Sequence, residues 1–403
     1  MLTKAFQPFR YRDYRLFWVA GAFSNIGMWA LVAGRLWLMH DLTRSPFMLG
    51  VVVLAGGGPF LLLTLLGGVV ADNTNRLKMV IFTRSGFAIL AFLTCVLVFS
   101  NLINPTYLIL ISISTGILLA FDLPSRQAML VGLVPKDQLV NAVAVYSIVT
   151  AGSAIIGPSL FAPLVNFWGI GSLFGLIGFM YALTVLLLSL IKTKHIAINQ
   201  KTGTEFRRGI LDGISYTFRH RGILLILSTG IGVGMFGLSF ETLLPVFAEE
   251  VFHGNVYAYG SLLLSIGIGG TIGTLFLSVM VGRSGILQIH YVSGIGLACF
   301  LIIFSFVEHL QHAYLVVGLI GMCSVIFLTS NSTTIQKLVD DKYRGRVMSL
   351  HQMTWGSTAL GGFVVGAIAQ STSAPFSVKI AGSLVLLIII FSLLARIRGK
   401  TSH

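Results

Sequence analysis

Three charged side chains stand inside long apolar stretches of the sequence: Arg35, Asp122 and Glu241. A charge in the hydrocarbon core of a bilayer is costly and usually marks a substrate or ion pathway. Burial disfavours the charged form of a carboxyl group, which suits a group that picks up and releases protons. We therefore predict that Glu241 and Asp122 couple proton movement. Asp122 has a structural alternative, because Arg126 lies one helical turn away and could pair with it.

Polar and aromatic residues in the same apolar stretches are candidates for lining a central substrate cavity. The predicted set is Asn25, Trp29, Arg35, Tyr146, Phe236, Glu241, Asn331, Gln352 and Trp355. Asn25 and Asn331 are the strongest candidates, because an amide in hydrocarbon requires a hydrogen-bond partner. Helix packing is the alternative for each residue. His290 and His351 could also carry protons, although their positions near helix ends favour an ordinary interfacial role.

Other kinds of chemistry find no support in the sequence. It shows no nucleophile–base pair, no phosphate-binding loop followed by lysine and no cluster with metal-ligand spacing, so we expect no catalysis, no cofactor and no metal. Cys95, Cys299 and Cys323 stand singly in apolar stretches, which indicates packed side chains and no disulfide framework. The glycines between Gly267 and Gly273 lie in an apolar run, which indicates close helix packing.

Composition determines which elements must position these residues. The 403 residues are 55% hydrophobic and only 10% charged, whereas soluble domains carry about 25% charged residues. Lipid must cover so much apolar surface, and each crossing of the bilayer needs about 20 apolar residues. We predict an all-α membrane protein with twelve transmembrane helices. Their expected ranges are 15–39, 46–70, 79–100, 104–124, 139–165, 169–191, 222–247, 255–281, 286–307, 312–332, 345–370 and 376–396.

The basic residues indicate the orientation of these helices. Of the 27 Lys and Arg residues, 24 fall in segments on the side of the termini, and only Arg44 and Lys379 fall on the opposite side. Short cytoplasmic loops carry such an excess of Lys and Arg, so both termini are predicted to be cytoplasmic. The net charge of +14 thus has a topological origin and does not indicate nucleic-acid binding.

The two halves of the chain repeat one another. An offset of 205 residues carries Arg126 onto Asn331 and Gly157 onto Gly362, in the same order along the chain. The longest polar stretch lies between the halves. We therefore predict a bundle of six helices in residues 1–191, a cytoplasmic linker in 192–221 and a second bundle in 222–403, arranged around a central cavity.

The loop after the second apolar run resembles the signature loop of the major facilitator superfamily. The match rests on Gly68, Asp72 and Arg76 in the stretch Gly-Val-Val-Ala-Asp-Asn-Thr-Asn-Arg. Asn73, Asn75 and Leu77 depart from the basic, Gly and basic residues that are usual there. The resemblance implies a conformational latch between the two bundles, in which Asp72 meets Arg126 and the helix start near Gly345.

The fifth predicted helix adds a partial match. Gly152, Gly157 and Pro158 resemble the antiporter signature of that superfamily, whereas Phe161 and Ala162 replace its later glycines. A packing kink is the alternative.

Further stretches resemble the bacterial exporter branch, which includes the enterobactin exporter and drug and macrolide efflux proteins. They are residues 9–18, 42–46, 124–126, 243–247 and 344–349.

We expect a monomeric secondary transporter in the bacterial inner (plasma) membrane. It would export amphipathic small molecules, such as drugs or siderophores, and its partners would be the substrate, protons and the lipid bilayer. An importer of the same fold and a lipid-moving protein remain alternatives. Arg35 and Glu241 both lie about 30 Å along their helices, so they could pair as a periplasmic gate; the alternative is that each turns toward water.

Overall fold

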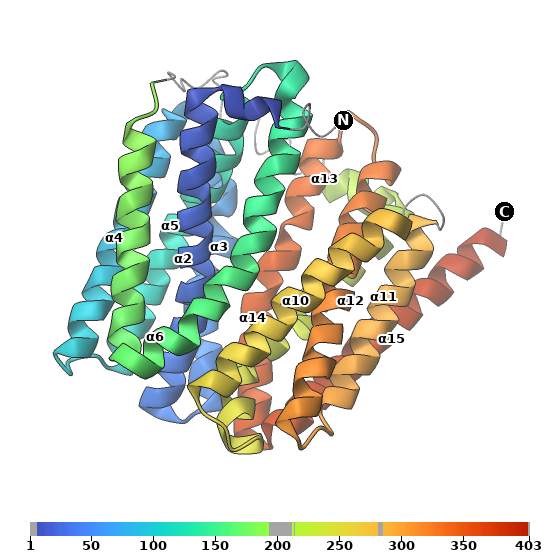
Figure 1. The fold of residues 1–403 in the computed structure, drawn as a ribbon. Helices are drawn as coiled ribbons and strands as arrows, with labels where there is room; N and C mark the ends of the chain where they lie inside the picture. The colour runs from blue at the N-terminus through green and yellow to red at the C-terminus, as the bar shows by residue number, and fades with distance from the viewer. Residues whose placement is uncertain (1–5, 193–211, 213, 281–284, 402–403) are drawn as a thin grey trace. The chain divides into compact units, whose positions relative to one another are not determined.

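The computed structural model describes residues 6–192, 212, 214–280 and 285–401, and a few side chains within these ranges are not described. Helices account for nearly all of the described chain (Figure 1). The helices of the amino-terminal half are α2 (Arg12–Thr43), α3 (Pro46–Asn73), α4 (Arg76–Phe99), α5 (Pro105–Val131) and α6 (Leu139–Ser189). The carboxyl-terminal half contains α8 (Arg221–Gly232), α9 (Leu244–Val246), α10 (Val256–Met280), α11 (Ile286–Phe304), α12 (Leu310–Leu338), α13 (Arg344–His351), α14 (Met353–Ser371) and α15 (Ala374–Thr401).

Ten helical segments in the described part of the chain are long and apolar enough to cross a membrane. One of them, Lys136–Ser189, is 54 residues long. It includes α6, in which Gly169 adopts φ 76° and ψ 167° and interrupts the helical backbone. Such a positive φ is readily available only to glycine. The sequence predicts two helices here, separated between 165 and 169, and the break lies at that point.

Local sequence signals explain several helix starts. Asn75 caps α4 by accepting a hydrogen bond from the backbone N–H of Lys78 at 3.1 Å. Asn104 caps α5 in the same way, and Pro105 occupies the first helical position. A side-chain oxygen at the residue before the helix accepts hydrogen bonds from backbone amides that have no partner within the helix. Proline at the first helical position has no such amide to leave unpaired. The asparagine that departs from the superfamily's loop pattern at position 75 thus serves as a helix cap.

The chain divides into two compact units. Unit 1 comprises Met1–Leu42 and Gly58–Gly203, and unit 2 comprises Thr43–Gly57 and Thr204–His403. Helix α3 therefore contributes its first half to unit 2 and its second half to unit 1. The predicted bundle boundary at 191 and the predicted linker are not tested by this division, and residues 193–211 of the linker lie outside the described residues.

In unit 1, α2 is anchored to α6 by two side-chain hydrogen bonds. The Tyr14 hydroxyl donates to the Ala142 carbonyl at 2.8 Å, and the Trp18 indole N–H donates to the Val145 carbonyl at 3.1 Å. Farther along, a Cβ at Gly157 would lie 2.7 Å from Trp29 Cβ, so glycine is needed for the close approach of the two helices. These contacts set the spacing of α2 and α6 on either side of the polar cluster described below.

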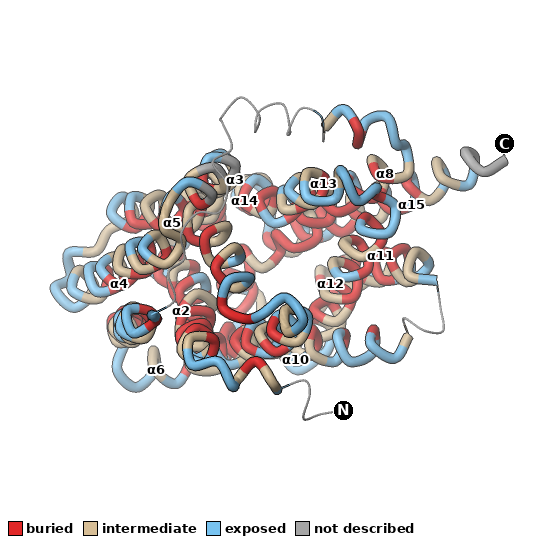
Figure 2. Tube along the Cα trace, turned by 90° about the horizontal axis from the view of Figure 1, so that it is seen from above, coloured by how far each residue is buried: buried red, intermediate tan, exposed pale blue. Residues whose placement is uncertain are grey.

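In unit 2, α12 packs against both α10 and α11, and α11 also packs against α15. Figure 2 shows buried residues along α11 and α12 where they face these neighbours. The first half of α3 packs on α14, where a Cβ at Gly50 would lie 2.8 Å from the Gly362 carbonyl oxygen. Small residues at such crossings allow membrane helices to approach closely.

The segment from Arg221 to Val251, which corresponds to the predicted helix 222–247, is irregular. After α8 it passes through a π-helical turn, η3 (Val233–Gly237), a 3₁₀ turn, η4 (Ser239–Leu243), the short α9, and a second π-helical turn, η5 (Phe247–Val251). Turns of this kind inside a helix often occur at functional sites. Phe236 and Glu241 both lie in this irregular region.

Candidate functional site

Asp122, on α5, is the centre of a buried ionic cluster in unit 1. Its carboxylate accepts a hydrogen bond from Arg84 Nη2 at 2.7 Å and another from the Thr83 hydroxyl at 3.0 Å. Arg126 Nε lies 3.5 Å from the same carboxylate, one helical turn along α5. The side chain of Asp122 is fully buried, and that of Arg84 is 4% exposed. The pairing of Asp122 with Arg126 that the sequence offers as a structural alternative is therefore present.

The cluster continues from Arg126 toward α2 and α6. Arg126 Nη1 donates to the Tyr146 hydroxyl at 3.1 Å and reaches Asn25 Oδ1 at 3.4 Å. Asn25 Nδ2 donates to the Gly21 carbonyl at 2.7 Å and lies 3.3 Å from the Tyr146 hydroxyl. The structure thus brings together Asn25 and Tyr146 from the predicted cavity set, the predicted proton carrier Asp122 and the predicted latch residue Arg126.

Arg84 is the member of this cluster that the sequence analysis missed. It is one of the 24 basic residues that the sequence assigns to the side of the termini, but it is 3% exposed and lies nine positions into α4. Its guanidinium also lies 5.6 Å from the ring centroid of Tyr181, within the range of a cation–π contact. One signal in the sequence could have identified the pair. Arg84 and Asp122 each lie in a different apolar run, and each needs an opposite charge when it is buried.

The electrostatic balance of the cluster is positive, since two guanidiniums share one carboxylate. A further guanidinium in unit 1, that of Arg35 on α2, makes fewer polar contacts. Its Nη1 lies 3.4 Å from the Thr115 hydroxyl, and its buried Nε has no hydrogen-bond partner in the part of the chain that the structure describes. Trp29, two turns before Arg35, has a buried indole N–H that likewise lacks a partner among the described residues. Unit 1 therefore holds fixed positive charge among its spanning helices.

Unit 2 contains a neutral counterpart around Thr229. The Thr229 hydroxyl donates to the Ile226 carbonyl at 2.7 Å, and it therefore accepts from His290 Nε2 at 3.1 Å. Asn331 Nδ2 donates to the same Ile226 carbonyl at 2.8 Å and lies 3.4 Å from the Thr229 hydroxyl. His290 and Asn331 are both 0% exposed. His290 lies near the start of α11, as expected, and its ring is buried and stacks on Phe327 at 4.5 Å between centroids; its interfacial role stays a prediction.

A cavity of about 430 Å³ opens between α12 and α13–α14 in unit 2. It is lined by Leu328, Thr329, Ser332, Thr333, Gln336, Met348, His351, Gln352 and Trp355. Gln352 and Trp355 belong to the predicted cavity set, so the structure places them in one cavity. His351, the last residue of α13, is also here and is buried, and its interfacial role stays a prediction. Hydroxyl, amide, imidazole and indole groups line this cavity, and none of the lining residues is Asp, Glu, Lys or Arg.

Glu241 and Phe236 are half-buried on the irregular segment between α8 and α10. No hydrogen bond or ion pair of the Glu241 carboxylate is found among the described residues. Arg35 belongs to unit 1 and Glu241 to unit 2, so the predicted gate between them stays a prediction.

The predicted latch is only partly described. The side chain of Asp72 lies outside the described part of the structure, and its role stays a prediction. Arg76, at the start of α4, donates from Nη1 to the Ala128 carbonyl on α5 at 3.3 Å. Gly68 of the signature loop is not at a close helix crossing, because a Cβ there would meet nothing within 4 Å. The neighbouring Gly67 is at such a crossing, against the Ala120 carbonyl.

Gly345 and Gly152 also have open space at the Cβ position, whereas Gly157 is tightly enclosed. Pro158 follows Gly157 inside α6, and the helix continues through it.

Known proteins resemble this chain in sequence over most of its length. A Staphyloferrin A transporter of Staphylococcus aureus is 27% identical over 348 residues, which cover 86% of each chain. Macrolide efflux protein A of Streptococcus pyogenes is 20% identical over 275 residues, which cover 67% of this chain and 68% of the relative.

Solved structures share the fold. The nucleoside transporter NupG aligns with a TM-score of 0.76 at 15% identity, covering 95% of this chain and 98% of its own. A bacterial homologue of the lysosomal transporter Spinster aligns with a TM-score of 0.73 at 13% identity, covering 96% of this chain and 97% of its own.

A family match covers nearly the whole chain. The family described as transmembrane secretion effector, within the major facilitator superfamily, matches residues 3–403. The predicted superfamily and the predicted multi-pass location in the bacterial plasma membrane are thereby confirmed. With its apolar spanning helices and its buried polar clusters, this chain belongs to the transmembrane secretion effector family of major facilitator superfamily transporters.

Proposed function

We propose that this transporter exports an amphipathic small molecule, drug-like or siderophore-like, by alternating access in exchange for protons. Two six-helix bundles, residues 1–191 and 222–403, would rock about a central site, with the linker 192–221 and both termini in the cytoplasm. The protein would work as a monomer.

Ten candidate spans support twelve crossings when α6 is counted as two helices at Gly169 and α13–α14 is added. At about 1.5 Å per residue, α6 is far too long for one crossing of a core about 30 Å thick.

The cavity between α12 and α13–α14 is the observation that carries this proposal. Its lining combines hydroxyl and amide groups with the indole of Trp355, and it contains no Asp, Glu, Lys or Arg. Such a surface can hydrogen-bond the polar groups of a ligand and pack against its apolar part. A phosphorylated or highly charged substrate would need several cationic groups in this cavity. The family and the named efflux relative point in the same direction.

Glu241 supports the proton-coupled part of the proposal. It is a half-buried carboxyl on a run that contains two π-helical turns and one 3₁₀ turn. Irregular backbone of this kind can change its hydrogen bonding with less disturbance than a regular helix. Protonation of Glu241 would remove a charge from the membrane interior, which couples the proton to the arrangement of this run.

Transport into everted membrane vesicles tests the direction. The cytoplasmic face is then outside, so an exporter fills the vesicles, and an acidic interior drives it. The substrates are fluorescent amphipathic dyes and the metabolites that a deletion strain fails to release into its medium. Accumulation driven by an acidic interior supports proton-coupled export. Accumulation that requires an acidic exterior indicates the importer alternative and refutes the proposal.

Glu241→Gln should abolish the response to the proton gradient while leaving exchange of substrate across the membrane. The amide keeps the shape of the side chain but cannot carry the proton. Glu250→Gln is the matched control, because this exposed glutamate lies near the end of the same irregular run and should tolerate the change. The measurement is dye accumulation in everted vesicles with and without an imposed gradient. Full retention of gradient-driven uptake in Glu241→Gln would assign coupling to another group, with Asp122 as the next candidate.

A further inference from the structure

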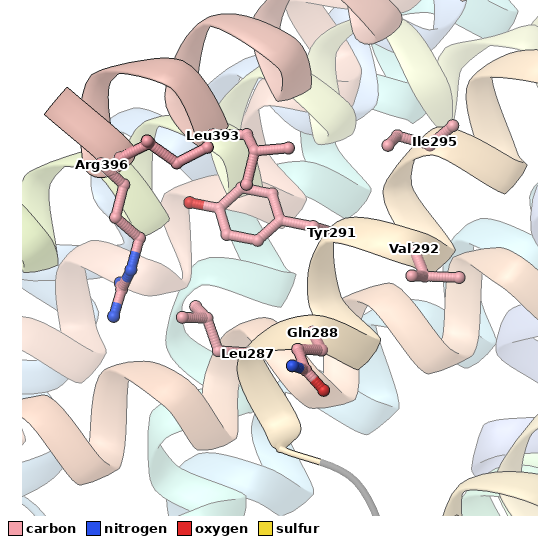
Figure 3. A pocket seen from close by; sticks show the side chains of 8 residues that line it. Leu287, Gln288, Tyr291, Val292, Ile295, Leu393 and Arg396 are labelled. Carbon is pink, nitrogen blue, oxygen red and sulfur yellow. The ribbon is translucent and has the colours of Figure 1, made fainter.

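A second cavity lies in unit 2, between α11 and α15, and it plays no part in the proposed transport site. Its volume is about 330 Å³. Figure 3 shows the residues that line it, which come from these two helices only: Leu287, Gln288, Tyr291, Val292, Ile295, Leu393, Arg396 and Ile397. The lining is apolar except for Gln288, Arg396 and the Tyr291 hydroxyl.

The apolar part of this groove is open to the surroundings of the protein. Val292 is 70% exposed and Ile397 is 52% exposed, whereas Tyr291 is 5% exposed and forms the floor. The Tyr291 hydroxyl is hydrogen-bonded to Ser392 at 3.2 Å, so the floor presents no unsatisfied polar group. From Leu287 to Ile295 the groove runs about 12 Å along α11, at 1.5 Å per residue. That length and that lining fit a segment of a lipid acyl chain.

One end of the groove is positively charged. Arg396 and Gln288 lie there, at the beginning of α11 (Figure 3). Neither side chain forms a hydrogen bond or ion pair with another residue in the described parts of the chain. The amino end of α11 has no side-chain cap at Gly285 and no acidic residue in its first turn. The positive end of a helix dipole favours an anion near the first turn, and here it acts in addition to the guanidinium.

Charge complementarity determines the class of lipid. Neither α11 nor α15 contains an Asp or Glu residue, so nothing on these helices would pair with the cationic group of a zwitterionic headgroup. A headgroup with net negative charge meets only attraction from Arg396. We propose that this groove is a binding site for an anionic phospholipid of the bilayer, with the phosphate at Arg396 and Gln288 and an acyl chain along Val292 and Ile295.

Native mass spectrometry of the full-length protein in detergent tests this site. Phosphatidylglycerol and phosphatidylcholine with identical acyl chains are added in turn, and the occupancy of the first bound lipid is compared. The wild-type protein should prefer phosphatidylglycerol. Arg396→Gln should lower that preference about five-fold, because one basic residue near the surface contributes on the order of that factor. Lys379→Gln removes the same charge near the opposite end of α15 and should leave the preference unchanged.

A second variant fills the groove and keeps Arg396. Val292→Trp should reduce retention of both lipids, since the position is on the surface and the change should not disturb the core. Equal binding of the two lipids by the wild-type protein, or an undiminished preference in Arg396→Gln, would overturn the proposal. Inorganic phosphate is added as a third arm. If it displaces phosphatidylglycerol at millimolar concentration, the site takes a free anion and the lipid assignment is wrong.

Discussion

The two units hold different chemistry at corresponding positions of the repeat. Asp122, Arg126 and Tyr146 in unit 1 correspond, at the offset of 205 residues, to Phe327, Asn331 and His351 in unit 2, and Arg84 corresponds to His290 at an offset of 206. Where unit 1 has an ion pair with 2.7 Å between Nη2 and Oδ2, unit 2 has an imidazole stacked on a phenyl ring at 4.5 Å. The same two helices of each half meet through both contacts, α4 with α5 and α11 with α12.

At these positions each half makes a contact between two of its helices, and only unit 1 makes that contact with charged groups. In the neutral cluster the Thr229 hydroxyl lies within hydrogen-bond distance of both His290 Nε2 and Asn331 Nδ2. A charged cluster carries a further consequence, because the loss of one partner leaves a buried charge uncompensated. The buried cluster of unit 1 is therefore charged and that of unit 2 is neutral, and the effects of substitution should differ between the two in size and in kind.

Asp122→Asn should have the largest effect on stability. The change leaves the buried guanidiniums of Arg84 and Arg126 without a carboxylate, and the loss of one partner of a buried pair costs about 3–5 kcal/mol. The measurement is the free energy of unfolding in mixed micelles as denaturing detergent is added. Asp137→Asn is the control, since Asp137 is exposed in the same unit and should change the value little. An equally small effect at Asp122 would show that the ionic cluster is not what holds α4 to α5.

Arg126→Asn should have a smaller effect, because it gives unit 1 the residue that unit 2 has at this place. Asp122 keeps Arg84 and Thr83, and the cluster becomes neutral overall. The hydrogen bond from the guanidinium to the Tyr146 hydroxyl is lost, which costs about 1.5–3 kcal/mol for a bond to a charged group. The same unfolding measurement checks this value, and Arg15→Gln at the exposed start of α2 is the control. If Arg126→Asn were as damaging as Asp122→Asn, the correspondence between Arg126 and Asn331 would have no structural meaning.

Much of the fold could be predicted from composition and hydropathy, because twenty apolar residues in a row have few alternatives to a spanning helix. The pair of Asp122 and Arg126 was also within reach, since both lie on one helix at a fixed spacing. Arg84 was not, because its partner lies 38 positions away on another helix. An arginine that follows two other basic residues near a helix start looks like an interfacial charge, and only the packing of α4 on α5 shows otherwise.

The irregular run between α8 and α10 shows a second limit of sequence reasoning. The hydropathy of Arg221–Val251 predicts one helix, and the glycines within it are compatible with a regular one. The π-helical and 3₁₀ turns arise where α14 lies close against the run, as at Gly361, whose Cβ position is occupied by the Met235 carbonyl. Such a contact depends on tertiary packing. The position of Glu241 in the chain could therefore be predicted from the sequence, but the conformation of the backbone around it could not.

Thr229→Val should have the smallest effect of the three substitutions that probe the comparison. Because the hydroxyl proton of Thr229 goes to the Ile226 carbonyl, the oxygen accepts from both His290 and Asn331. Valine preserves the shape and removes that acceptor, so two buried donors lose one bond while no charge is left unpaired. The expected cost is about 1 kcal/mol, the net value of a neutral hydrogen bond.

Ser228→Ala, at the exposed neighbouring position, is the matched control and should change the unfolding free energy by less. A cost for Thr229→Val as large as that for Asp122→Asn would mean that the neutral cluster is no easier to dismantle than the ionic one. The difference between the halves would then lie in the charge they present to a substrate and not in how they are held together.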